Sequence, residues 1–144
     1  MKYPQIILGL ILIGFVMVSC APSAPSTVEI MEILKTKVNE KDLEGVMTLF
    51  AEDAVLEYSF ENWSFHGTKE IEYYWTTYVF PKPFIAEYRD ISVEGDSATF
   101  IWVDAGTNTD GTSYDALWPT IIEVQNGKII HLDIYENKEV IIGD

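Results

Sequence analysis

The chain has 144 residues, of which 48% are hydrophobic, and its formal net charge is −14. This length corresponds to one domain, and the apolar content suffices for a hydrophobic core. The acidic excess disfavours nucleic acids and anionic membrane surfaces as binding partners. Because the chain has a single cysteine, it forms no internal disulfide.

The N-terminus has the layout of a signal peptide. Lys2 precedes an apolar run of 13 residues, from position 6 to position 18, whereas a membrane-spanning helix needs about 20. The end of this run, Met17-Val18-Ser19-Cys20, resembles the lipobox of bacterial lipoproteins. We therefore expect residues 1–19 to be a lipoprotein signal peptide. Cys20 would then be the mature N-terminus and carry acyl chains such as palmitate.

Two alternatives remain for this segment: a plain secretory signal with an incidental cysteine, and a retained, uncleaved anchor. A retained anchor leaves the domain on the same side of the membrane, so the expected location is the extracytoplasmic side of the cell envelope. Two or more acyl chains hold a protein at a membrane where one does not. Residues 20–26 are small and include two prolines, which predicts a short tether before the domain at 27–144.

Two helices are predicted at the start of the domain. Ser26 and Glu29 have the spacing of a capping box, and apolar residues at every fourth position continue the helix to about Asn39. Asp42 is the expected cap of a second helix. Its apolar face is formed by Leu43, Val46, Met47 and Phe50.

The rest of the chain is predicted to be mainly strands. A short strand at 54–60 precedes a third helix that opens at Gly67 and ends before Pro81. Asn126-Gly127 favours a tight hairpin, and Pro119 predicts a bend, a bulge or an edge position. The strands are expected at 84–93, 97–105, 113–124 and 129–135.

These elements predict an α+β domain with three N-terminal helices on one face of a bent, mainly antiparallel sheet. Residues 38–54, 66–71 and 126–129 are similar to the signature of the SnoaL-like, or nuclear transport factor 2-like, superfamily, and the resemblance covers about residues 27–140. It implies a cone-shaped barrel with an internal pocket, commonly in a homodimer. Members include ketosteroid isomerase, epoxide hydrolases, dehydratases and cyclases, beside many proteins that catalyse nothing, so function must be argued from the site.

The resemblance also argues against one activity. A ketosteroid isomerase needs a carboxylate base together with a tyrosine and a protonated acid. When the chain is aligned through Asn39 and Asp42, these three roles fall on Tyr58, Leu34 and a position near Ile121. None of the three keeps the required side chain, so we expect no steroid isomerase of that kind.

Several aromatic residues and one acid are the candidate site. Tyr58 should point into the cone with Ala54, Leu56 and Phe60, since alternate strand residues share a face. Asp104 follows two aromatic residues on one strand face and is the candidate catalytic acid with Tyr58; Asp115 is a weaker candidate. Each of these residues could equally be a core aromatic or a solvated strand end. The expected pocket residues are Leu34, Tyr58, Trp75, Trp102 and Trp118.

The two histidines do not predict a metal site. His66 and His131 are far apart in the sequence and lack a matching carboxylate spacing. No glycine-rich phosphate loop appears either, so we expect neither metal nor cofactor. His131 and Asp133 should lie on the outer face of the last strand, because Leu132 and Ile134 face the core. A bulge would swap the two faces and make His131 and Asp133 an acid/base pair inside the pocket.

Three functions follow from this reading. The first is the binding of a small hydrophobic molecule in an aromatic-lined pocket. The second is a cofactor-free isomerase, cyclase or dehydratase that uses a pocket carboxylate with Tyr58. The third is an adaptor lipoprotein that forms a homodimer or binds a partner through the outer sheet face, formed by Ile101, Val103, Ile121 and Ile129.

Overall fold

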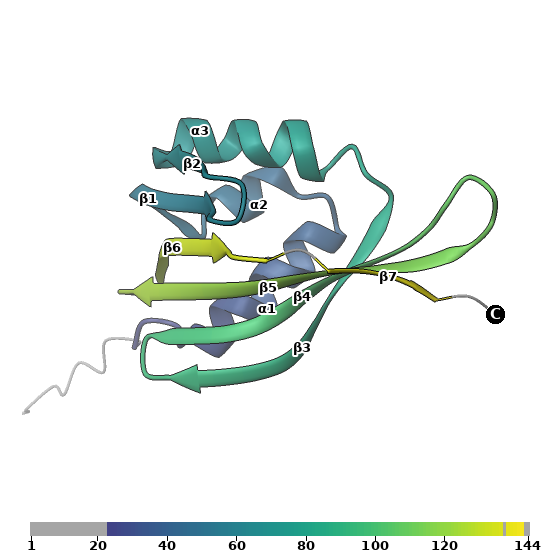
Figure 1. The fold of residues 1–144 in the computed structure, drawn as a ribbon. Coiled ribbons are helices and arrows are strands. Elements are labelled where there is room, and N and C mark those ends of the chain that lie inside the picture. Colours follow the sequence, from purple (N-terminus) through teal and green to yellow (C-terminus); the bar gives the residue numbers. More distant parts are fainter. Residues whose placement is uncertain (1–22, 137, 143–144) are drawn as a thin grey trace, which may run out of the picture.

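The computed structural model describes residues 23–136 and the backbone of residues 138–142 (Figure 1). The predicted signal peptide, Cys20 and the first part of the tether lie outside the described residues. The helices are α1 (Thr27–Asn39), α2 (Leu43–Met47), α3 (Gly67–Tyr74) and the π-helical continuation η1 (Trp75–Val79). Among the described residues, no helix has the length and apolar character needed to span a bilayer.

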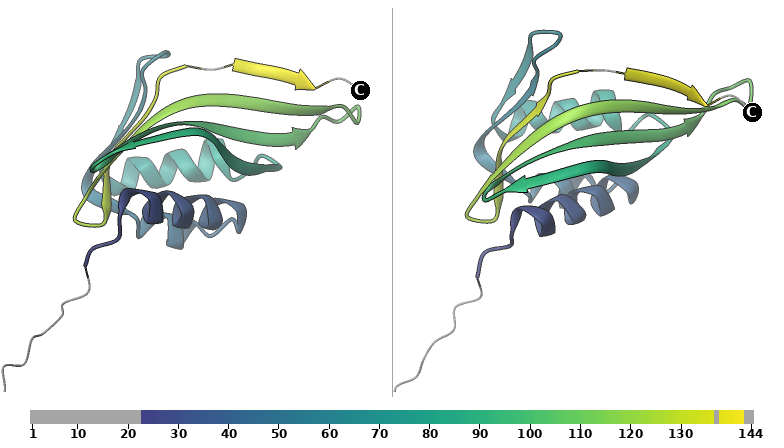
Figure 2. Two further views of the ribbon diagram at one scale, coloured as in Figure 1. Left: turned by 90° about the horizontal axis from the view of Figure 1, so that it is seen from below. Right: turned by 60° about the horizontal axis from the view of Figure 1, so that its bottom comes forward.

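The strands form one curled sheet, which does not close into a complete barrel (Figure 2). Their order is β2-β1-β6-β5-β4-β3, with β7 paired to β5, and only the β1/β6 pair is parallel. The predicted α+β class with a mainly antiparallel sheet is therefore confirmed. The strands are β1 (Phe50–Tyr58), β2 (Trp63–His66), β3 (Phe84–Glu94), β4 (Ser97–Thr107), β5 (Ser113–Gln125), β6 (Lys128–Ile134) and β7 (Lys138–Ile142).

The helix α1 begins and ends where the sequence predicts, and α2 begins as predicted but ends at Met47, so Phe50 opens β1 and does not belong to the helix. Both hydrogen bonds of the Ser26–Glu29 capping box are present, and Asp42 caps α2 by accepting from the Gly45 amide at 2.8 Å. Two strands were not predicted. The first, β2, places His66 at its end rather than in a loop, and the second, β7, follows the last predicted strand.

The strand β5 accommodates Pro119 at the junction between two partners. Upstream of Pro119, β5 pairs with β7, and downstream it pairs with β6. The Pro119 carbonyl accepts from the Tyr135 amide at 3.1 Å. The N–H and C=O of one strand residue point to the same side of the strand. The N–H that Pro119 lacks would therefore point to the junction between β7 and β6, so its absence costs the sheet no hydrogen bond.

The predicted hairpin between β5 and β6 is confirmed by its backbone. Asn126 and Gly127 both have positive φ, 51° and 72°, as a type I′ turn requires. Gly127 also leaves space for the end of the tether, because a Cβ there would lie 2.7 Å from the Pro25 Cδ. The tether therefore meets the domain at this turn.

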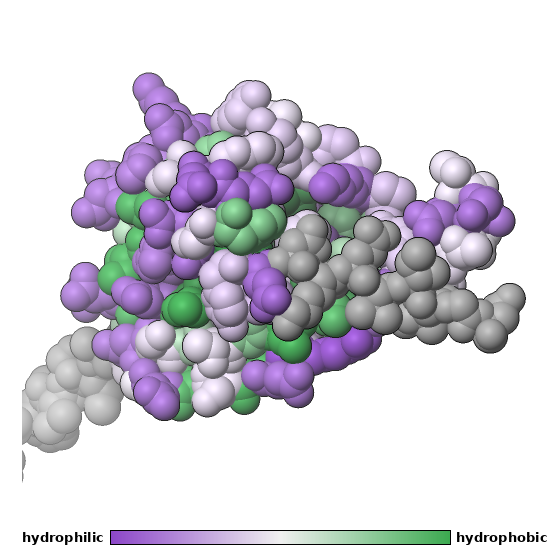
Figure 3. All heavy atoms as spheres, viewed as in Figure 1, coloured by the Kyte–Doolittle hydropathy of each residue, from purple (hydrophilic) through white to green (hydrophobic). Residues whose placement is uncertain are grey.

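The helices cover the concave face of the sheet, and the core lies between them (Figure 2). The α1 helix packs against β3 and β5, and α3 packs against β1 and β2. Leu34, Leu56, Ile71 and Ile122 are completely buried in this core. The face seen in Figure 3 is mainly hydrophilic with scattered hydrophobic residues, as expected for a water-exposed sheet surface.

A bulge in β6 changes one predicted face. The pairing of β5 with β6 shifts between Glu123 and Val124, which leaves Ile130 unmatched. Ile129 consequently turns into the core and is completely buried, so its predicted place on the outer face was wrong. Because the bulge comes before His131, the residues after it keep their predicted faces: Leu132 and Ile134 point inside, and His131 lies on the outer face.

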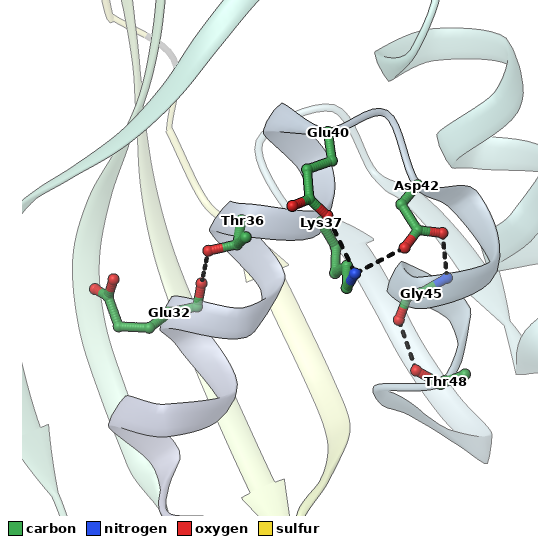
Figure 4. Close-up of polar contacts among 7 residues, drawn as sticks. All are labelled: Glu32, Thr36, Lys37, Glu40, Asp42, Gly45 and Thr48. Carbon is green, nitrogen blue, oxygen red and sulfur yellow. Dashed lines mark hydrogen bonds and ion pairs between the residues drawn. The ribbon is translucent and has the colours of Figure 1, made fainter.

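A network of polar side chains fixes the corner between α1 and α2 (Figure 4). Lys37 Nζ lies 3.1 Å from the Glu40 carboxylate and 2.9 Å from that of Asp42. The bond from Lys37 lowers the pKa of Asp42, and the same bond raises the pKa of Lys37. The missing side chain of Gly45 lets the Asp42 carboxylate lie against the backbone of α2, because a Cβ at position 45 would lie 2.4 Å from that carboxylate.

Asn39 connects the end of α1 to the free edge of the sheet. Its side-chain Nδ2 donates to the Ala86 carbonyl at 3.0 Å, and its Oδ1 accepts from the Ala86 amide at 2.7 Å. Ala86 lies in β3, the last strand in the sheet order, so the amide of Asn39 takes the place of a neighbouring strand.

We predict that Asn39→Ala lowers the free energy of unfolding by about 1–3 kcal/mol, because both backbone groups of Ala86 lose their partner. Urea denaturation of the purified protein measures the effect. Thr36→Ala, on the exposed side of the same helix, is the matched control and should change stability by less than about 0.5 kcal/mol. Equal losses for the two variants would contradict the role given to Asn39.

Candidate functional site

A small cavity lies between the α3–η1 helix and the concave face of the sheet. Seven aromatic residues line it: Tyr58, Tyr74, Trp75, Tyr78, Phe84, Trp102 and Trp118. Asp104, Lys82 and Thr120 are the polar residues of its wall. The cavity volume is about 50 Å³, which is space for a few water molecules.

The helical side of the cavity contains a change of helix type. The Phe80 amide donates to the carbonyl of Trp75, five residues earlier, at 2.9 Å. This π-helical turn adds one residue to the helix before Pro81 and Pro83 end it, and such turns often occur at functional sites. It carries Trp75, Tyr78 and Val79 to the cavity wall.

Two tyrosine hydroxyls form a hydrogen-bonded pair in the wall. The Tyr58 and Tyr74 oxygens are 2.6 Å apart. Burial raises the pKa of Tyr58 to about 12, although the bond with Tyr74 acts against this rise. Burial, followed by the neighbouring Tyr58, raises the pKa of Tyr74 well above its usual value. Only one hydroxyl can donate to the other, so the second O–H can donate to a molecule in the cavity.

Asp104 is the acidic group of the cavity. One carboxylate oxygen accepts from Trp102 Nε1 at 2.8 Å and the other from Trp118 Nε1 at 3.0 Å. Burial raises the pKa of Asp104, while these two bonds and the charges of Lys82 and Lys41 oppose the rise. The two indoles thus hold a carboxylate in a mainly apolar wall.

Trp75 is the most deeply buried of the seven aromatic residues, with 2% of its surface exposed. Its ring lies 5.4 Å from that of Tyr74 and 6.2 Å from that of Trp102, at interplanar angles of 72° and 47°. Trp75 Nε1 is buried and has no hydrogen-bond partner among the described residues. The wall therefore contains an unmatched donor, which is uncommon in folded proteins.

The structure brings together four of the five residues expected to form the pocket. Tyr58, Trp75, Trp102 and Trp118 line one cavity together with Asp104. Leu34 does not reach the cavity and is completely buried in the core. Phe60 was expected to point inward, but it follows the end of β1 and is 36% exposed.

The other candidate residues lie elsewhere. Asp115 is 6% exposed and binds Arg89 Nη2 at 2.7 Å, outside the cavity. His131 Nε2 lies 2.9 Å from Glu57 Oε2 on the outer face of the sheet, and Asp133 accepts from Ser59 Oγ at 2.7 Å. Over the described part of the chain, no group of three or more His, Cys, Asp or Glu side chains is arranged to hold a metal ion.

Sequence reasoning missed two residues that define the polar character of the cavity. Tyr74 precedes Trp75 on the predicted helix, and only the tertiary structure reveals its bond to Tyr58. Lys82 lies between Pro81 and Pro83, in a segment whose sequence predicts nothing more than the end of a helix. An exposed lysine beside two prolines carries no local signal of a cavity.

The chain is an α+β domain with an aromatic-lined cavity between its helices and a curled sheet. Residues 34–132 match the family model of the SnoaL-like domain. This chain belongs to the SnoaL-like domain family. The sequence matches none of the curated proteins.

Three solved structures illustrate the shared fold. A computationally designed 17-OHP binder has 18% identity and a TM-score of 0.68, over 83% of this chain and 100% of the binder. Rv0760c from Mycobacterium tuberculosis, solved in complex with estradiol-17beta-hemisuccinate, has 17% identity and a TM-score of 0.66, over 78% of this chain and 95% of that one. A Δ5-3-ketosteroid isomerase from Mycobacterium sp. has 17% identity and a TM-score of 0.65, over 81% and 100%.

We predict that the buried tyrosines destabilise the fold in alkali. Tyrosine ionises near pH 10 when unfolded, whereas the folded pKa of Tyr58 is about 12. The folded state therefore keeps a proton that the unfolded state loses. This contribution to stability is complete below pH 10 and disappears as the pH rises towards 12.

Unfolding by urea at a series of pH values measures this effect. Tyr58→Phe should make the loss of stability above pH 10 less steep, whereas Tyr73→Phe, a change at an exposed tyrosine, is the matched control. An unchanged slope in Tyr58→Phe would contradict the assignment.

Proposed function

We propose that this domain binds a small hydrophobic molecule that has one polar end. The observation that carries the proposal is the composition of the cavity wall, in which seven aromatic side chains surround one carboxylate and one hydroxyl pair. Mainly apolar pockets with a few convergent polar groups are the usual form of ligand sites. The aromatic rings supply contact area, and Tyr58, Tyr74 and Asp104 fix the orientation of the polar end.

The size of the cavity limits the ligand. A volume of about 50 Å³ is far below the roughly 300–1,000 Å³ of pockets that enclose drug-sized molecules. Only a compact group fits inside, so a larger ligand would project past the exposed Lys82 at the cavity mouth. The steroid derivatives bound by two proteins of similar fold support ligand binding in this architecture, although this cavity as it stands is too small to enclose one.

We predict that Tyr58→Phe weakens the binding of ligands with a carbonyl group about tenfold, because one hydrogen bond of about 1 kcal/mol or more is lost. A thermal-shift screen against small hydrophobic metabolites identifies the ligand, and titration calorimetry compares the variants. Tyr73→Phe, which does not line the cavity, should leave the affinity unchanged. If no compound of this class raises the melting temperature, the proposal fails.

Catalysis is the second candidate, because Asp104 and Tyr58 line the same cavity. A carboxylate whose pKa is raised by burial is a stronger base and can take a proton from a ligand and return it. A hydroxyl donor beside it can stabilise an enolate or alkoxide. This arrangement supports a cofactor-free isomerase, cyclase or dehydratase. The direct test is the exchange of a ligand proton with solvent deuterium, which should be lost in Asp104→Asn.

We also propose that the domain is a lipoprotein held at the extracytoplasmic membrane surface through Cys20, and that it works as a homodimer. The lipobox-like Met17-Val18-Ser19-Cys20 and the short tether support the first part. Ile85, which is 56% exposed on the outer side of β3, supports a contact through the outer sheet face. Sedimentation of the purified protein decides the oligomeric state.

We predict that Cys20→Ser in the full chain abolishes incorporation of labelled palmitate and moves the protein from the detergent phase to the aqueous phase on phase separation. Each lost acyl methylene removes about 0.8 kcal/mol of membrane affinity. Ser23→Ala is the matched control and should remain in the detergent phase. Labelling that persists in Cys20→Ser would exclude Cys20 as the acylated residue.

A further inference from the structure

Several aromatic residues of the cavity wall form a box rather than a stack. Adjacent rings meet at large angles: 54° for Tyr58 and Tyr74, 74° for Tyr58 and Trp118, and 47° for Trp75 and Trp102. Their centroids are 5.6–6.3 Å apart in these pairs. Rings inclined in this way enclose a space on several sides. The π-face of an aromatic ring is electronegative and attracts cations, most strongly for tryptophan.

Asp104 adds a fixed negative charge to this box. Two indole N–H groups hold its carboxylate at 2.8 and 3.0 Å, and hydrogen bonds of this kind stabilise the ionised form. No lysine, arginine or histidine among the described residues makes an ion pair with it. A buried carboxylate is normally paired with a cation. The charges of Lys82 and Lys41 act on the carboxylate without contacting it, so the cavity offers the position for a cation that touches Asp104 directly.

The geometry points to a compact methylated ammonium group as the cavity's occupant, with its methyl groups against the aromatic rings and its charge beside Asp104. We propose this class of ligand for the same cavity; the proposal rests on the part of the proposed function that the cavity holds a small molecule, and it replaces the hydrophobic ligand with a charged one. A quaternary ammonium group is compact, carries apolar methyl surface and has no N–H to hydrogen-bond. It therefore suits a cavity of about 50 Å³ that is lined by rings and one acid.

Two lysines near the cavity mouth restrict the class of ligand further. Lys82 lines the cavity, is exposed, and has no ion-pair partner in the described part of the chain. Lys41 Nζ donates to the Lys82 carbonyl at 3.0 Å and lies 4.3 Å from the Phe84 ring centroid. These charges oppose a lone cation at the mouth but attract a carboxylate. The complementary ligand is a zwitterion that has its ammonium inside and its carboxylate at the mouth.

Titration calorimetry with four probes tests the proposal. Glycine betaine is compared with 3,3-dimethylbutanoate, which replaces the charged nitrogen by carbon, and choline is compared with 3,3-dimethylbutan-1-ol. We expect each ammonium compound to bind at least about tenfold more tightly than its carbon isostere, since a desolvated cation among aromatic rings gains this much. We also expect betaine to bind more tightly than choline. Isosteres that bind as tightly as the ammonium compounds would overturn the proposal.

Variants of Asp104 and Lys82 test whether these two side chains determine the preference for a zwitterion. Asp104→Asn should weaken betaine binding about tenfold, whereas Asp53→Asn, an exposed acid outside the cavity, should not change it. Lys82→Gln should remove the preference for betaine over choline, and Lys69→Gln on α3 is its control. If Asp104→Asn does not fold, the exposed Lys82 keeps the proposal testable. A preference unchanged in Lys82→Gln would overturn the selection of a zwitterion.

The outcomes also separate this inference from the proposed function. Binding of neutral hydrophobic compounds without any preference for ammonium groups would sustain the proposed function and overturn the inference. Failure of every neutral, cationic and zwitterionic probe to bind at millimolar concentration would overturn both.

Discussion

The carboxylate of Asp104, held between two indole N–H groups, determines the inner wall of the cavity. Trp102 and Trp118 lie opposite each other on β4 and β5, and each donates to one oxygen of Asp104. A hydrogen bond to a charged group contributes about 1.5–3 kcal/mol, which offsets the cost of removing the carboxylate from water. Neither indole can turn away without leaving a buried acceptor unmatched. The three side chains therefore fix one another, and with them the shape of the wall.

The opposite wall depends on the end of the third helix. The π-helical turn at Trp75 continues the helix as far as the prolines allow, and Tyr74 hydrogen-bonds Tyr58 of β1 in the cavity wall. This joins the helix to the sheet through two polar atoms within an apolar contact. The cavity has few polar groups, and second residues hold its hydroxyl pair and its carboxylate in place. That is the organisation expected of a site that orients a ligand.

Much of the fold could be predicted from local patterns. The Ser26–Glu29 capping box, the Asp42 cap and the Asn126-Gly127 hairpin are all present as expected, because each depends on residues within a few positions. The strand β2 was missed because its four residues are too few to establish a pattern of alternation. Ile129 was placed on the wrong face because a single unmatched residue, Ile130, reverses the alternation and has no sequence signal of its own.

The sequence by itself determined the class of fold and the acidic character of the chain. It also identified Tyr58, Trp75, Trp102 and Trp118 as the aromatic residues of one site. Periodicity and composition encode these properties without any long-range contact. Only the tertiary structure decided that Tyr58 meets Tyr74, that Asp104 lies between two indoles, and that Lys82 reaches the cavity mouth. Except for the bond between Trp102 and Asp104, these contacts join residues 14 or more positions apart or depend on a loop between two prolines, and the curvature of the sheet brings them together.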